Sequence, residues 1–145
     1  MASSRWRQRD PLYRGDDAAG VAVPDPSSTT SVVPHILYLG GRGRLTPYTS
    51  TTESKEVGAY FAGHRGTVWL ATASGAVVAG AKHRSQGQLL QDLRGRGKGN
   101  ARWSNSFEVA QAASYVEQWS EHLLDWSDVP PSAISLAIGR TFRNP

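Results

Sequence analysis

The stretch TPYTSTTESKEVGAYFAG, from Thr46 to Gly63, opens with a cluster of hydroxyl side chains and continues into two glutamates and an aromatic-rich segment. A turn needs only one or two hydroxyls, and a half-buried strand needs alternating apolar residues, so neither accounts for the whole cluster. A hydroxyl can brace a ligand or a catalytic carboxylate, and it can also cap a helix. Taken alone, the cluster is more typical of a helix cap at Thr52 or Ser54.

Residue spacing disfavours two other kinds of reactive site and weakly indicates a third. The histidines lie far apart with no pair at helical spacing, which argues against a metal site; they are His35, His64, His83 and His122. No serine stands in a GxSxG-type turn, which argues against a Ser-His-acid hydrolase. The basic segments GGRGR and RGRGKG suit phosphate groups but lack Walker A spacing, and solvated loops of this composition are more common than binding sites.

Composition limits the class of protein. A chain of 145 residues suits one domain, which we place at 11–145 behind a flexible N-terminal segment, 1–10. The net charge of +4 and the pI near 9.8 suit a polyanionic or phosphate-bearing ligand, or serve solubility alone. The absence of cysteine excludes disulfides and thiolate metal sites. No apolar run approaches the roughly 20 residues of a membrane span, and MASSRWRQRD lacks the apolar core of a signal peptide, so we expect a soluble protein without a cleaved leader.

The elements that must position any site mix strands and helices without regular βαβ alternation, which predicts an α+β fold. A helix over 31–41 is expected to start at Ser31, with Pro34 in its first turn and Gly40-Gly41 at its end. Asn105 and Glu108 have capping-box spacing at the start of another helix. The remaining expectations are a strand at 10–17, a loop at 18–30, a helix at 53–63, a buried strand at 66–74, a strand or turn at 75–80, a helix at 85–93, a flexible basic loop at 94–103 and strands at 121–138 broken by Pro130-Pro131.

The order of these segments resembles that of a known enzyme family. Arg14 in LYRG is followed 36 residues later by the TSTT junction, a helix ending in FA, a VW strand, and Glu121 opening SEHLLDWSDVPPSAISLAI. This order resembles the mono-ADP-ribosyltransferase toxins of the Arg–Ser-Thr-Ser–Glu type. LYRGDD and YTSTTES…FA are most similar to the branch that includes the pierisin-like and Scabin-like DNA-modifying enzymes. The resemblance covers 11 to about 138 and implies an ADP-ribosyltransferase-like split β-sandwich with a few short helices.

The resemblance implies NAD as substrate, no metal, and a site built on three catalytic residues. Glu121 would stabilise the oxocarbenium-like transition state that forms when the nicotinamide–ribose bond breaks. Arg14 would hold a phosphate or ribose oxygen with its forked guanidinium, and Ser50 would brace the ribose or the carboxylate of Glu121. Thr51 would point to the other side of the strand and hold the fold, and Thr52, where the family has serine, would cap the next helix. The residues predicted to bind NAD are Arg14, Gly15, Ser50, Thr51, Thr52 and Phe61.

Two regions are candidates for binding the acceptor of ADP-ribose. Trp119 stands two residues before Glu121, where the family usually carries Gln or Glu to select the acceptor, and Glu117 is the neighbouring alternative. The basic loop can follow a phosphate backbone, and Trp103 beside it can stack on an unpaired base; its cations are Arg94, Arg96 and Lys98. Tyr60 and Phe61 would either pack in the core, which their residue types favour, or offer a face to nicotinamide.

Three functions are therefore carried forward. The first is a toxin or effector domain that transfers ADP-ribose from NAD to a nucleic acid or a protein. The second is an NAD glycohydrolase toxin on the same fold, and the third is a non-catalytic basic module that binds nucleic acid. A toxin of this kind would act in the cytoplasm of a target cell and would have a cognate immunity or antitoxin protein as a partner.

Overall fold

The computed structural model describes residues 6–39 and 45–144, which form an α+β arrangement around a five-stranded antiparallel sheet. This confirms the predicted class. Across the sheet in the order β3-β1-β2-β5-β4, the strands are β1 (Pro11–Asp17), β2 (Tyr48–Thr52), β3 (Gly66–Thr72), β4 (Lys82–Arg84) and β5 (Glu121–Asp125). The helices and helical turns are α1 (Val32–Pro34), the π-helical η2 (His35–Leu39), α2 (Lys55–Ala62), α3 (Ala73–Val78), α4 (Gln86–Asp92), η3 (Gly99–Ala101), α5 (Ser106–Trp119), η4 (Pro131–Ala133) and α6 (Ile134–Thr141).

The sheet divides into two parts that meet between β1 and β2. β1 pairs with β3 along all seven of its residues. On the other side, β5 lies between β2 and β4 and pairs with both. β1 and β2 are in register at Tyr13 and Thr52, a much shorter seam than either of the others. Side chains from both strands can therefore reach the space where the two parts meet.

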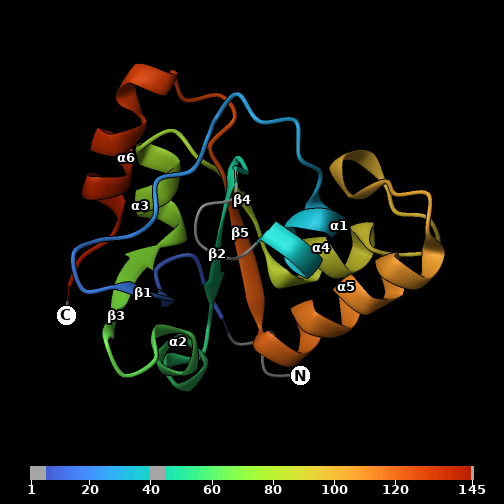
Figure 1. Ribbon diagram of the computed structural model, residues 1–145, viewed down its shortest axis with the longest axis horizontal. Helices are drawn as coiled ribbons and strands as arrows, with labels where there is room; N and C mark the ends of the chain where they lie inside the picture. Colours follow the sequence, from blue (N-terminus) through green and yellow to red (C-terminus); the bar gives the residue numbers. More distant parts are fainter. Residues whose placement is uncertain (1–5, 40–44, 145) are drawn as a thin grey trace.

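Helices cover the two faces of the sheet, as Figure 1 shows. α3 and α6 pack on one face with Leu124 and Trp126, whereas α1, α4 and α5 pack on the other with Leu123. Because successive residues of a strand point to opposite faces, neighbouring leucines of β5 belong to two different cores. All five residues of β5 are buried, so this strand runs through the centre of the molecule.

The helix predicted over 53–63 is confirmed as α2. Ser54 caps its first turn by accepting a hydrogen bond from the backbone N–H of Val57 at 3.2 Å. Gly63 ends the helix with a φ of 66°, a conformation that glycine adopts without strain. Of the two predicted caps, Ser54 is therefore the cap, and the role predicted for Thr52 is wrong.

Helix α5 delivers the chain to β5. Asn105 caps its start by accepting hydrogen bonds from the N–H groups of Phe107 (3.0 Å) and Glu108 (3.2 Å), which confirms the predicted N-terminus. Its end is unusual because Ser120 has a φ of 48° and a ψ of 49°, the left-handed region that residues other than glycine rarely adopt. Glu121 follows directly, so this tight turn sets where its side chain begins.

Two segments form helices where the sequence predicted otherwise: 75–80, expected to be a strand or a turn, and the segment after Pro130-Pro131, expected to be a strand. At 75–80, Thr72 accepts a hydrogen bond from the N–H of Gly75 at 3.0 Å and starts α3. After Pro130-Pro131 the chain turns through η4 into α6, where a strand was expected. The buried residues of α6 recur at helical spacing, a period that a strand cannot use; they are Ile134, Ala137, Ile138 and Thr141.

The helix predicted over 31–41 is confirmed at its start and differs further on. It begins after Ser31 as α1 and continues as the π-helical η2. Pro34 lies in the first turn as expected, but the side chain of Ser31 makes no capping hydrogen bond. Gly40 and Gly41, which were predicted to end this helix, lie outside the described residues.

The strand predicted at 66–74 is confirmed as β3, although most of its residues are half-buried rather than buried. The basic segment 94–103, predicted to be a flexible loop, is folded by backbone hydrogen bonds. The N–H of Gly97 donates to the carbonyl of Arg94, and the N–H of Trp103 donates to that of Arg96, both at 2.8 Å.

At the N-terminus, the packed part of the chain includes Trp6, whose ring contacts His122. None of the helices in the described ranges has both the length and the apolar character needed to cross a bilayer.

Candidate active site

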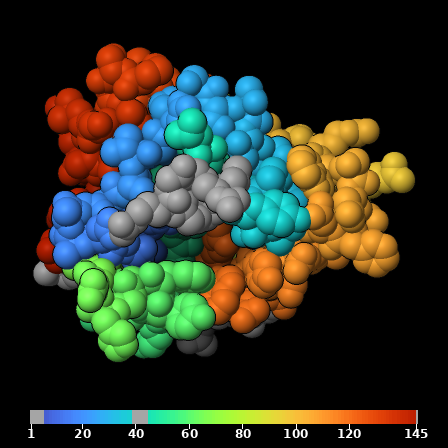
Figure 2. All heavy atoms as spheres, viewed as in Figure 1, coloured from blue at the N-terminus to red at the C-terminus, as the bar shows by residue number. Residues whose placement is uncertain are grey.

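A pocket of about 550 Å³ opens where the two parts of the sheet meet. Its walls come from β1, η2, β2, α2, the C-terminal end of α5 and the start of β5. Figure 2 shows the hollow, bordered by α2 in green and the end of α5 in orange. The pocket brings together all the residues predicted for catalysis and NAD binding, namely Arg14, Gly15, Ser50, Thr51, Thr52, Phe61 and Glu121.

Glu121 supplies a buried carboxyl group to this pocket. It opens β5 opposite Thr52 of β2, and only 8% of it is exposed. Burial raises the pKa of its carboxyl group to about 7, because the charged form loses hydration. A hydrogen bond from Ser50 and the charge of Arg14 act in the opposite direction and favour the carboxylate. Near neutral pH the group therefore exchanges readily between a charged acceptor and a neutral acid.

Arg14 links the two parts of the sheet beside this carboxyl group. Its Nε donates to Oδ2 of Asp16 at 3.0 Å, and Nη1 donates to the backbone carbonyl of Ser50 at 3.2 Å. The side chain is 17% exposed. Because a guanidinium has five N–H donors, these two bonds hold its plane in place and leave donors for a ligand.

Gly15 lets helix α2 lie directly against β1. A Cβ atom at this position would stand 2.1 Å from the carbonyl oxygen of Gly58 and 2.4 Å from the amide nitrogen of Ala62. No side chain fits in that space. The predicted role of Gly15 in binding NAD is therefore accompanied by a packing role, which brings α2 and its aromatic side chains to the edge of the pocket.

The neighbouring hydroxyl groups of β2 make different contacts and have different roles. Ser50 hydrogen-bonds the carboxyl group of Glu121 and also lies 2.8 Å from a ring nitrogen of His35. Thr51 is buried and donates to the backbone carbonyl of His122 at 3.1 Å, in keeping with its predicted structural role. Thr52 donates to the carbonyl of Trp119 at 2.6 Å and so ties the end of β2 to the end of α5.

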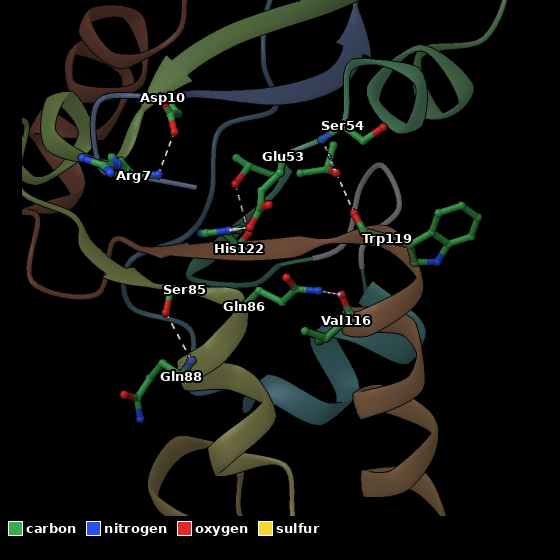
Figure 3. Close-up of polar contacts among 12 residues, drawn as sticks. Arg7, Asp10, Glu53, Ser54, Ser85, Gln86, Gln88, Val116, Trp119 and His122 are labelled. Atoms are coloured by element: carbon green, nitrogen blue, oxygen red, sulfur yellow. Dashed lines mark hydrogen bonds and ion pairs between the residues drawn. The ribbon is translucent and has the colours of Figure 1, made fainter. Parts of the chain in front are cut away.

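Three aromatic rings, two of them exposed and that of Trp119 half-buried, form a rim on the pocket. Tyr60 is 70% exposed and Phe61 is 56% exposed, so the expectation that they pack in the core is wrong. The ring of Tyr60 stacks on that of Trp119, with centroids 5.7 Å apart and an angle of 14° between planes, and Phe61 meets Trp119 edge-on at 5.2 Å. Figure 3 shows the Trp119 side chain projecting away from the helix end. Trp119, the predicted acceptor-selecting residue, therefore lies on the pocket with both aromatic residues of α2.

The basic loop does not contribute to this pocket. Arg94, Arg96 and Lys98 are exposed, but they precede α5, whereas Trp119 ends it, and the helix has 14 residues. At 1.5 Å per residue, α5 separates the two regions by about 20 Å. Trp103 is partly buried against the core, and its indole N–H donates to Glu108 at 2.7 Å. The N–H edge of its ring is therefore occupied.

His35 is the site residue that sequence reasoning missed. It is 2% exposed, lines the pocket, and contacts Thr46 and Ser50 with its two ring nitrogens. The sequence contained one signal, a single histidine within the otherwise apolar segment VVPHILYL. Its distance from the other histidines argues against a metal site but gives no indication of a hydrogen-bonding role. Within the described ranges, no group of three or more histidine and acidic side chains is arranged to hold a metal.

Comparisons with family models, with curated proteins and with solved structures found no match to this chain. A buried carboxyl group, a serine hydroxyl bonded to it and an arginine occupy one pocket with an aromatic rim. Such a site can stabilise a developing positive charge, bind a phosphate or ribose oxygen, and hold a flat ring.

Proposed function

We propose that this domain cleaves NAD and transfers ADP-ribose to a macromolecule. The observation that carries the proposal is the buried carboxyl group of Glu121, hydrogen-bonded to Ser50 and facing Arg14 in one pocket. The division of the sheet between β1 and β2 further supports an ADP-ribosyltransferase-like split β-sandwich, because the pocket opens at that division. The resemblance in motif order supplies the reaction class, and the geometry supplies a role for each residue.

The reaction breaks the bond between ribose C1′ and the nicotinamide nitrogen. Nicotinamide leaves with the bonding electrons, and the ribose becomes cation-like until a nucleophile on the acceptor forms the new bond at C1′. The carboxylate of Glu121 stabilises that positive charge, which develops fully only in the transition state. Arg14 holds a phosphate or ribose oxygen with its remaining N–H donors, and Ser50 keeps the carboxylate in place.

The aromatic rim supports an acceptor that offers a flat ring. Tyr60, Phe61 and Trp119 are exposed or half-buried beside the carboxyl group, where an incoming group must approach. Stacking on such rings is tolerant of base identity. Together with the net charge of +4, this favours a nucleic acid as acceptor, with a protein side chain as the alternative.

Labelled NAD tests the proposal directly. The protein is incubated with NAD labelled in its adenine half, in the presence of DNA, RNA, a protein mixture, or no acceptor. Label on DNA or RNA, with an equal amount of released nicotinamide, is the expected result. Label on protein would show that the acceptor is a protein and not a nucleic acid. Nicotinamide release without labelled acceptor would indicate a glycohydrolase. No NAD consumption in any arm would contradict the proposal and favour a binding module.

Arg14→Lys is expected to weaken NAD binding although it preserves the charge. One ammonium group cannot replace both the Asp16 contact and the Ser50 contact while also donating to a ligand. Loss of one charge-assisted hydrogen bond predicts a Kd for NAD that is higher by about 10- to 100-fold. Calorimetric titration measures this, with the exposed Arg65→Lys as matched control. Equal affinity in the two variants would remove Arg14 from the binding site.

The basic loop is tested by replacing Arg94, Arg96 and Lys98 with alanine. If nucleic acid is the acceptor and lies along the loop, the triple variant should show a salt dependence of modification flatter by about two to three units of log–log slope. Acceptor-free NAD cleavage should stay unchanged, because the loop is separated from the pocket by α5. A second triple variant at exposed positions removes the same charge elsewhere and separates local from net-charge effects; it replaces Arg9, Arg65 and Lys82. Identical behaviour of the two triple variants would exclude the loop from acceptor binding.

A further inference from the structure

His35 lies behind the proposed catalytic carboxyl group and contacts a residue on each side of its ring. Nδ1 is 2.8 Å from the hydroxyl oxygen of Thr46, and Nε2 is 2.8 Å from the hydroxyl oxygen of Ser50. Tyr48 holds the ring edge-on, with centroids 5.3 Å apart. The mechanism proposed above does not use this histidine, although it reaches Glu121 through a single intervening hydroxyl group.

Thr46, His35, Ser50 and Glu121 form a hydrogen-bonded series, and the carboxylate of Glu121 at its end determines the direction of each hydrogen bond. An ionised carboxylate only accepts, so Ser50 must donate its hydroxyl proton to Glu121. The oxygen of Ser50 is then free to accept, and the only proton that His35 can direct to it is on Nε2. Nδ1 of the neutral ring must in turn accept, and its partner is the hydroxyl of Thr46.

At the other end of the hydrogen-bonded series, a backbone N–H group donates to Thr46. The hydroxyl oxygen of Thr46 accepts a hydrogen bond from the N–H of Tyr48 at 3.3 Å, so its own proton is available for Nδ1 of His35. Every donor in the series therefore points toward the carboxylate, from the backbone of β2 through Thr46, His35 and Ser50. A series with one direction holds each hydroxyl in a single orientation, where an isolated serine would rotate among several.

The ring stays neutral over the range in which the site would work. Burial, together with the nearby positive charge of Arg14, lowers the pKa of His35 to about 3. Among the described residues of the pocket lining, Arg14 is the charged group that faces both His35 and Glu121, and the other titratable side chains are Tyr13, Tyr60 and Tyr115. A neutral imidazole has one donor and one acceptor, which this chain of hydrogen bonds requires.

We propose that His35 is a positioning residue, which, as its Nε2–H tautomer, orients the Ser50 hydroxyl so that this hydroxyl donates to the carboxylate of Glu121. The catalytic relevance of this arrangement rests on the function proposed above, but the arrangement itself does not. It favours the charged form of Glu121 against the effect of burial, and it holds the carboxylate in one rotamer. In this role His35 acts through the Ser50 hydroxyl group and not through contact with the reacting atoms.

The tautomer is tested first, on the unaltered protein. Two-dimensional ¹H–¹⁵N spectra of the histidine rings at pH 8 distinguish Nε2–H from Nδ1–H by the nitrogen shifts. We expect His35 to be neutral with its proton on Nε2. A proton on Nδ1, or a ring that titrates near its ordinary pKa of about 6.5, would overturn the proposal whether or not the protein cleaves NAD.

The coupling to Glu121 is tested with variants and a carboxyl titration. His35→Leu should raise the pKa of Glu121, followed by ¹³C NMR, by about one unit, the size of one lost hydrogen bond to a charged group. His35→Gln, whose amide nitrogen lies near the position of Nε2, should restore most of this shift. Ser50→Ala should give the same shift alone or combined with His35→Leu, because both changes remove one interaction.

The outcomes separate this proposal from the proposed function. Independent, additive shifts in the two variants would show that His35 does not act through Ser50, and unchanged Glu121 titration in both would refute the arrangement. If His35→Leu does not fold, the spectra of the unaltered protein and of His35→Gln still decide. If NAD is cleaved, the acid limb of the kcat/KM profile should move to higher pH with the carboxyl pKa, with little change in the Kd for NAD. If NAD is not cleaved, the function fails while the titration still tests the arrangement.

Discussion

Glu121→Gln is expected to lower NAD cleavage by about 10²- to 10³-fold, because a preorganised charge aimed at the transition state is lost. The amide matches the carboxyl group in size, so the packing around the start of β5 should be preserved. Single-turnover assays at saturating NAD measure the chemical step. The Kd for NAD should change little, since the charge acts chiefly on the transition state.

The same substitution is expected to stabilise the fold above neutral pH. The pKa of Glu121 is about 7 in the folded protein against an ordinary value of 4.5, so the folded state binds the proton more tightly. A group of this kind contributes stability below pH 4.5 and loses it as pH rises through 7, because the buried carboxyl group must then ionise. A neutral amide avoids that cost. At pH 8 the free energy of unfolding of Glu121→Gln should exceed that of the unaltered protein by about 1–3 kcal/mol.

Urea unfolding at pH 5 and pH 8 measures this difference, which should shrink toward the lower pH. Glu56→Gln is the matched control, because Glu56 is exposed in the first turn of α2 and does not line the pocket. It should change neither activity nor stability by more than a few tenths of a kcal/mol. Full NAD cleavage in a folded Glu121→Gln variant would contradict the assignment, and the glutamates Glu117 and Glu108 would then be tested.

The local signals in the sequence predicted the parts of the fold that depend on local chemistry. Asn105 and Gly63 mark helix ends because a cap and a left-handed turn each depend on one residue. The strand character of β1 and of β5 was likewise visible. By contrast, α3 and α6 were missed because short runs of alanine, valine and isoleucine fit either a strand or a helix, and tertiary packing decides between them.

The aromatic rim shows where a pattern of apolar residues misleads. Val57, Tyr60 and Phe61 lie at helical spacing, which normally marks the face that packs on the core. In α2 the face toward β1 is instead the one with Gly58, because the close approach over Gly15 leaves no room for large side chains. The aromatic residues are therefore displaced to the rim of the pocket, which no local pattern indicates.

The site was predicted from the order of motifs rather than from spacing. Arg14, Ser50 and Glu121 lie on three strands, and only the assembled sheet brings them into one pocket. His35 could not be placed in the same way, since its partner Ser50 lies 15 residues away on another element. Pairings of this kind depend on how η2 packs against β2, and no local pattern in the sequence indicates that packing.

A second group of buried histidines predicts pronounced sensitivity to acid. His83 and His122 stack at 5.1 Å with a 2.8 Å contact between ring nitrogens, and Trp6 packs over both. Figure 3 shows His122 directed at Glu53, 2.6 Å from its carboxyl oxygen. Because the carboxylate only accepts, His122 donates to Glu53 and accepts from His83, and both rings are neutral. The pKa of each histidine is lowered to about 4, by burial at His122 and by burial together with the proximity of His122 at His83.

The lowered pKa values of the buried histidines determine how the free energy of unfolding changes with pH. The unfolded chain binds a proton at each histidine near pH 6.5, whereas the folded chain does so near pH 4 at this pair and near pH 3 at His35. Stability is therefore complete above pH 6.5 and is lost as pH falls toward 4. The raised pKa values of Glu121 and Glu53, the latter due to burial and Asp10, act in the opposite direction. The balance predicts a net uptake of about two protons on unfolding near pH 5, or about 2.7 kcal/mol lost per pH unit.

Urea unfolding followed by circular dichroism at pH 7, 6, 5 and 4 measures that slope. His83→Gln should reduce the uptake by about one proton, because one depressed imidazole is gone while an amide can still donate to His122. His64→Gln is the matched control: His64 is exposed, so its removal should leave the slope as it is in the unaltered protein. A free energy of unfolding that stays level from pH 7 to pH 4, or equal slopes in the two variants, would show that the His83–His122 pair is not the source of acid sensitivity. A slope reduced only in His83→Gln would locate it there, on an element that does not line the candidate active site.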